Sequence, residues 1–93
     1  MKGFPFLENK VSKSIVIREF LDSVRQKELV WHQDKEDRYV KVIKSNGWML
    51  QLDNELPVVL EEGKEYFIPK YTFHRVIKGT QNLILEIKKI INK

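Results

Sequence analysis

The chain lacks cysteine, which excludes a disulfide framework, a cysteine-based zinc site and a thiol nucleophile. Any metal site must therefore use His, Asp or Glu. The four glycines and three prolines occur singly, so we expect no linker and predict one domain over residues 1–93. No stretch approaches the roughly 18 apolar residues of a membrane span, and residues 1–10 lack the apolar core of a secretory signal. We expect a cytoplasmic protein without membrane contact.

An excess of charge of one sign is also lacking. Lysine and arginine together number 17, against 13 acidic residues, which leaves a net charge of +4. The charges are scattered along the chain, as is typical of a solvated surface. We therefore expect no nucleic-acid partner.

Residues 14–27 carry apolar side chains every three or four positions, with charged residues between them. This spacing predicts an amphipathic helix capped by Ser12 or Ser14. The β-branched run from Ile15 to Ile17 also favours a strand, so a strand over residues 14–19 is the competing interpretation. Residues 1–27 are thus predicted to form an N-terminal segment with a short helix.

After residue 28 the apolar period changes to two, as in β-strands. Residues 38–44 and 48–52 each place alternate apolar side chains on one face, namely Val40 and Val42, then Trp48, Leu50 and Leu52. The turn-forming residues 45–47 between them predict a tight hairpin. Further turn signals recur about every ten residues, which predicts a β-sandwich or barrel. Trp31 and Trp48 lie among apolar residues in such segments and are predicted to be buried.

The two histidines are the residues best suited to chemistry. His32 and Asp34 are two positions apart, so on an extended strand both side chains leave the same face, which Glu36 and Arg38 would continue. With His74 from a later strand they supply two imidazoles and one carboxylate, a ligand set that suits Fe, Zn, Ni or Mn and leaves positions open for substrate. His32, Asp34 and His74 are therefore the predicted metal ligands, and Glu36 is a candidate fourth ligand.

A second motif surrounds His74. The spacing of Gly63, Pro69 and His74, with five residues between glycine and proline and the histidine five positions on, resembles the second motif of the cupin superfamily. Tyr71 replaces that family's usual second glycine, and Lys78 replaces its frequent asparagine. The resemblance implies an all-β fold, a small antiparallel β-barrel of the double-stranded β-helix type, which we place over residues 28–88.

The first cupin motif is only partly present, as His32-Gln33-Asp34 followed by Arg38 and Gly47. Asp34 replaces the second histidine, and Arg38 stands where the ligand glutamate is expected. Residues 31–38 also resemble small cupin proteins of bacteriophages. A cation at position 38 would repel a bound metal ion unless Asp34 or Glu36 neutralises it.

Two arrangements of the site remain open. In the first, the two histidines and Asp34 bind a divalent ion, and Arg38 turns away or binds an anionic substrate. In the second, Asp34 or Glu36 pairs with Arg38, the histidines form local hydrogen bonds, and the barrel is a metal-free pocket. Arg75, next to His74, points to the opposite face, where we predict a salt bridge on the outside of the barrel.

Three functional classes follow. The first is a small-molecule-binding cupin with a divalent metal, which as an enzyme would be dioxygenase-like or isomerase-like. The second is a metal-free ligand-binding or regulatory module, and the third is a structural accessory protein of the phage type. A barrel this small buries little core alone, so we also expect a homodimer, with its interface supplied by apolar residues near both ends, namely Phe4, Phe6, Leu7, Ile90 and Ile91.

Overall fold

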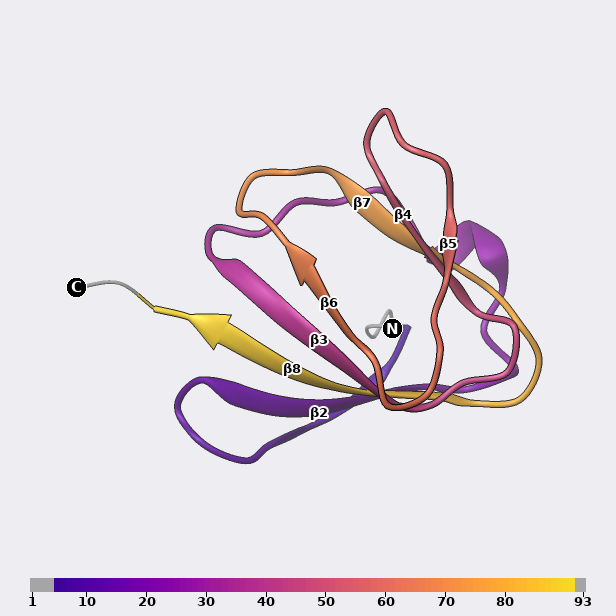
Figure 1. Cartoon of the computed structure of the whole chain (residues 1–93). Helices are drawn as coiled ribbons and strands as arrows, with labels where there is room; N and C mark the ends of the chain where they lie inside the picture. Colours follow the sequence, from indigo (N-terminus) through magenta and orange to yellow (C-terminus); the bar gives the residue numbers. More distant parts are fainter. Residues whose placement is uncertain (1–4, 92–93) are drawn as a thin grey trace.

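Two antiparallel β-sheets face each other in the computed structural model, which describes residues 5–91 (Figure 1). The five-stranded sheet has the order β1 (Leu7–Lys10), β2 (Ile15–Phe20), β8 (Leu83–Ile90), β3 (Asp37–Lys44) and β6 (Glu65–Ile68). The three-stranded sheet has the order β5 (Val58–Val59), β4 (Met49–Leu52) and β7 (His74–Ile77). The predicted all-β class and small antiparallel barrel are confirmed. Phe4 lies outside the described residues.

Helical structure is nearly absent from the described residues. The 3-10 turn η1 (Gln26–Glu28) is the one helical element within residues 5–91. Residues 5–91 contain no helix with the length and apolar composition of a membrane span.

The core lies between the sheets and follows the period-two pattern. Strand β3 buries Val40 and Val42. Strand β4 buries Leu50, Trp48 is buried directly before this strand, and Leu52 packs against the core. Strand β8 contributes Leu83, Leu85 and Ile87 from alternate positions. Because alternate residues of a strand point to opposite faces, each of these strands buries one face against the other sheet.

The helix predicted over residues 14–27 is wrong, and the competing strand is correct. Strand β2 pairs with β1 on one side and with β8 on the other, so its backbone hydrogen bonds come from distant residues. Val16 and Phe20 are buried on its inner face, and Arg18 lies between them on that face. Residues 7–10 and 15–20 are therefore strands of the larger sheet.

The hairpin predicted at residues 45–47 is also wrong. Strand β3 pairs with β6 and β8, whereas β4 pairs with β5 and β7, so these residues connect the two sheets. Gly47 has a φ of +79°, as the turn chemistry predicted, but the chain turns from one sheet to the other. Gly79 lies against this turn, and a Cβ there would come within 2.3 Å of the Asn46 carbonyl oxygen.

The two tryptophans differ in burial. Trp48 is fully buried, and its indole N–H donates to the carbonyls of Thr80 and Gln81 at 3.2 and 3.0 Å. Trp31 is 41% exposed, so its predicted burial is wrong. The Arg75 guanidinium lies 4.8 Å from the centre of the Trp31 ring and donates to Gln51. Arg75 therefore stacks on an aromatic ring and hydrogen-bonds to an amide, where a salt bridge was predicted.

Candidate metal centre

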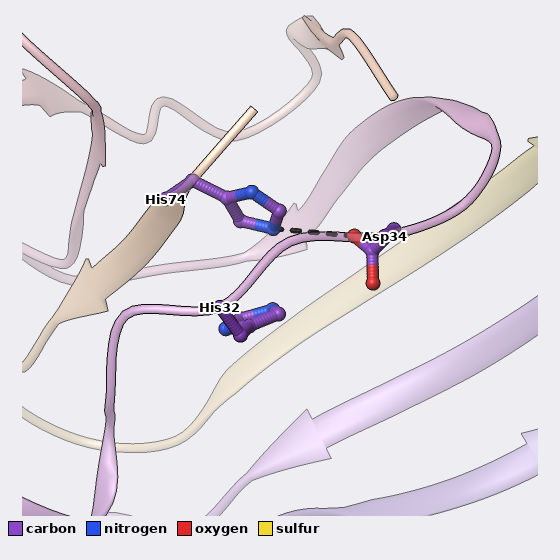
Figure 2. Close-up of side chains that lie close together, drawn as sticks. All are labelled: His32, Asp34 and His74. Carbon is purple, nitrogen blue, oxygen red and sulfur yellow. Dashed lines mark ion pairs between the residues drawn. The ribbon is translucent and has the colours of Figure 1, made fainter. Parts of the chain in front are cut away.

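Three of the predicted ligands converge where the sheets approach each other (Figure 2). His32 and His74 exchange two backbone hydrogen bonds of 3.0 and 2.8 Å, which attach residue 32 to the free edge of β7. The chain then crosses to β3 in the other sheet, and the Tyr71 N–H donates to the Asp34 carbonyl at 2.7 Å. One ligand atom from each of His32, Asp34 and His74 lies within 4.8 Å of the others.

The turn that supports Asp34 has the shape that the second motif requires. Gly63 and Tyr71 have φ values of +86° and +62°, so Tyr71 adopts the left-handed conformation at the position where cupins usually carry glycine. The Thr72 N–H donates to the Pro69 carbonyl and closes this turn. The motif thus places His74 and the backbone support of Asp34 together.

Both imidazoles present the same nitrogen to the site. The Nδ1 atom of His32 lies 3.1 Å from the Val30 carbonyl oxygen, and Nδ1 of His74 lies 2.8 Å from that of Thr72. A carbonyl oxygen accepts only, so each Nδ1 carries the hydrogen. In the neutral rings Nε2 therefore has the free lone pair, an arrangement typical of metal-binding histidines.

Asp34 supplies an oxygen without a protein donor. Its Oδ2 atom is buried and makes no hydrogen bond, although Nε2 of His74 lies 3.3 Å away. When His74 is neutral, Oδ2 and Nε2 are both acceptors, so only a proton or another cation between them stabilises the pair. The residues present therefore fit a divalent ion, because the buried oxygen and both free lone pairs belong to one group.

Arg38 is neutralised by the acids that flank it. Its Nη2 lies 3.3 Å from Asp34 Oδ1 and 2.7 Å from Glu36 Oε2, and its Nε donates to the same Glu36 oxygen at 2.8 Å. Glu36, the candidate fourth ligand, does not belong to the group of possible metal ligands that His32, Asp34 and His74 form within residues 5–91. Features of both predicted arrangements thus occur together, because one oxygen of Asp34 faces Arg38 and the other faces His74.

Two ionisable groups are shifted toward the forms that a metal ion needs. Desolvation, reinforced by His74, lowers the pKa of His32 against the raising effect of the Val30 carbonyl. Burial alone would raise the pKa of Asp34, but His74, Arg38 and His32 outweigh it and hold that pKa below its ordinary value. A neutral imidazole and an ionised carboxylate are the ligating forms.

A cavity of about 370 Å³ opens beside the group, lined by His32, Asp34 and Arg38 together with Arg18. A smaller cavity of about 40 Å³ shares these four lining residues and is also lined by His74 and by residues of the core. Volumes of this order hold small molecules. Arg18 was not predicted as a site residue, because a helix over residues 14–27 would make it one of the charged residues between the apolar positions. Alternation with Val16 and Phe20 in a strand was the signal that predicts its inward direction.

Asp37 lies away from the site. Its Oδ1 accepts the Lys70 N–H at 2.8 Å, so its role in the described structure is to hold the turn after β6. It provides a matched acidic control for experiments on Asp34.

Comparison with known proteins gives structural matches alone. No protein-family model matches the chain, and no curated protein matches it. A cupin domain from Bordetella pertussis Tohama I is similar with a TM-score of 0.63 and 18% identity, covering 98% of this chain and 99% of that one. HppE with cobalt(II) gives 0.73 and 14%, covering 97% and 56%, and a structure of DMSP lyases gives 0.69 and 17%, covering 81% and 36%.

The molecule is an all-β protein of two facing antiparallel sheets with a His-Asp-His group at their junction. These matches show that its fold is the cupin fold, as the motif at Gly63, Pro69 and His74 indicated. The chain spans between 36% and 56% of the length of the lyase and HppE chains reported above.

Proposed function

We propose that this protein binds a divalent metal ion through His32, Asp34 and His74 and a small molecule in the adjoining cavity. The buried Asp34 Oδ2 carries the proposal, because it lacks a donor and faces an imidazole lone pair. Solved structures of HppE, which has a similar fold, are described with iron(II) and cobalt(II). Fe, Zn, Ni and Mn all suit two imidazoles and a carboxylate.

The chain's own residues prepare the site. The Val30 and Thr72 carbonyls orient the imidazoles. Glu36 positions Arg38, and Arg38 pairs with the ionised Asp34 carboxylate. A bound ion would supply Lewis acidity and open positions for substrate, the basis of a dioxygenase-like or isomerase-like activity. Arg38 lines the cavity beside these ligands and is the proposed substrate-binding residue, whereas Glu36 is committed to Arg38.

A metal-free binding module is the second candidate. The ion pairs of Arg38 with Asp34 and Glu36 support it, because an arginine that neutralises these carboxylates reduces the negative charge available to a cation. In this case a proton shared between His74 and Asp34 replaces the metal, and the cavity binds its ligand without turnover.

Metal titration separates these candidates. Zinc, nickel, manganese and iron(II) are titrated by calorimetry into wild type and into His74→Ala, Asp34→Asn and Asp37→Asn after chelator treatment. We expect binding to wild type and Asp37→Asn below about 100 μM, and at least tenfold weaker binding to the other two because each loses a ligand. Absence of binding to wild type, or unchanged binding to His74→Ala, contradicts the metal site and favours the metal-free module.

We also propose that the protein is a homodimer. Leu7 and Ile91 near the two ends are each 58% exposed, and β1 is an edge strand, all features that favour pairing. Phe6 is partly buried against the core and contributes less. Sedimentation at tens of micromolar tests this, and the mass of a single chain contradicts it.

A further inference from the structure

We propose that the ligand of the cavity is a small carboxylate with a short apolar body, and that Arg18 recognises its carboxylate. For the metal-bound form this rests on the proposed function. Arg18 is not part of either cupin motif, because it comes from β2 in the five-stranded sheet, whereas His74 comes from β7 in the three-stranded sheet. The inference follows from the burial of its charge, its partners and the lining of the cavity.

The Arg18 side chain is only 12% exposed. A buried guanidinium is rare in proteins and requires a partner of opposite charge, because burial removes it from water. Desolvation lowers the pKa of Arg18, but an arginine remains protonated near neutral pH. Its Nη2 lies 2.6 Å from Glu8 Oε2 and its Nε donates to the same oxygen at 2.8 Å. Within residues 5–91, Glu8 is the one acid paired with this cation.

Both contacts use one edge of the guanidinium. Because the group is planar with three edges, pairing through Nε and Nη2 leaves the end formed by Nη1 and Nη2 for a second acceptor. Phe6 covers one face of the group, with its ring centre 3.9 Å from the guanidinium carbon. A planar carboxylate in the cavity matches the remaining end in a bidentate manner.

The charges of the site favour a single negative charge on the ligand. Arg18 and Arg38 are each balanced by a glutamate, Glu8 and Glu36 respectively. A divalent ion on two neutral imidazoles and one aspartate leaves one uncompensated positive charge in a partly buried cavity. A monoanion neutralises it, whereas a dianion would leave a buried excess of negative charge.

The other walls are apolar and define the body of the ligand. Phe20, Leu29 and Val76 line the cavity with Phe6, and they offer no hydrogen-bonding side chains. The cavity volume of about 370 Å³ is at the small end of the range for ligand sites. A short aliphatic chain on the carboxylate would fill this apolar part and exclude water from the ion pair.

The test compares butyrate with butyramide, which has nearly the same shape but no charge. Both are titrated by calorimetry and by amide-resolved NMR into the zinc-loaded protein and the chelator-treated protein. The variants are Arg18→Gln, Arg18→Lys and Glu8→Gln. Arg25→Gln is the control, because Arg25 is 67% exposed and does not line the cavity. NMR spectra of each variant establish that it is folded before affinities are compared.

We expect butyrate to bind wild type at least tenfold more tightly than butyramide. Arg18→Gln should lose that preference, Arg18→Lys should keep part of it, and Arg25→Gln should retain it fully. Glu8→Gln keeps the guanidinium and removes its competing carboxylate, so it should bind butyrate more tightly than wild type. This variant tests the proposal even where Arg18→Gln does not fold.

Equal binding of butyrate and butyramide to wild type overturns the proposal, as does unchanged butyrate affinity in folded Arg18→Gln or in Glu8→Gln. The zinc titration separates this failure from that of the proposed function. Zinc binding without preference for butyrate contradicts the carboxylate ligand alone. A preference that depends on Arg18 in protein that binds no zinc contradicts the metal site and leaves Arg18 as the recognition residue.

Discussion

Replacement of Trp48 by alanine should remove a large part of the protein's free energy of unfolding. The side chain is fully buried, and a buried tryptophan removes about 150–250 Å² from water, worth about 4–6 kcal/mol at 25 cal/mol/Å². Measured large-to-small changes of this kind cost about 3–5 kcal/mol. A chain of this length has a free energy of unfolding of about 5–14 kcal/mol. Trp48→Ala therefore leaves a marginal fold.

Urea unfolding followed by far-ultraviolet circular dichroism measures this loss. With a slope of about 1–1.5 kcal/mol/M, the midpoint should fall by about 3 M. Trp48→Phe should lose less, because it keeps most of the volume and leaves only the Thr80 and Gln81 carbonyls without a donor. Trp31→Ala is the matched control, and it should lose clearly less than Trp48→Ala because the Trp31 side chain is 41% exposed. A loss below about 1 kcal/mol in Trp48→Ala would refute the assigned packing.

Two other outcomes are expected. Gly79→Ala should lower the free energy of unfolding by about 3 kcal/mol in urea melts, because its Cβ would lie 2.3 Å from a backbone oxygen. Gly63→Ala should lose only about 1 kcal/mol from its positive φ, because its Cβ would meet no atom within 4 Å. Equal losses in the two variants would contradict the close approach at Gly79. The lowered pKa of His32 means that this residue binds a proton more readily in the unfolded chain than in the folded one. The melting temperature of metal-free protein should therefore fall as the pH decreases below about 6.5. A further fall is expected below about pH 3.9, because the pKa of Asp34 is also lowered in the folded protein. His32→Gln should flatten the first decrease, and a wild-type melting temperature that is constant from pH 7 to 5 would contradict it.

Local patterns predicted strands β3 and β4, because apolar side chains at every second position show directly which face of a strand is buried. They failed for residues 14–27, where apolar residues at 15, 16, 17, 20, 21 and 24 satisfy a helix and a strand alike. The deciding interactions are the backbone pairs with β1 and β8, and β8 lies about 70 residues away along the chain. The same error hid Arg18, since a helical wheel places it in solvent.

The candidate metal ligands were predicted from spacing and motif together, and the structure brings His32, Asp34 and His74 into one group. The mechanism of convergence was not as predicted, because residues 32–36 are not a continuous strand and β3 begins at Asp37. The direction of Arg38 was beyond sequence reasoning. Arg38 contacts both Asp34 and Glu36, and this depends on the path of the chain as it crosses between the sheets.

The backbone pairing of His32 and His74 should also make the folded chain bind an ion more tightly than the unfolded chain. In a disordered chain, one ion held by both residues would have to close a loop of about 40 residues, an entropy cost of about 4 kcal/mol. In the folded protein two backbone hydrogen bonds have already closed that loop. The folded site therefore starts with an advantage of about a thousandfold in affinity over the same residues in a flexible peptide. A bound ion should therefore raise the free energy of unfolding, in a chain that has no disulfide to cross-link it.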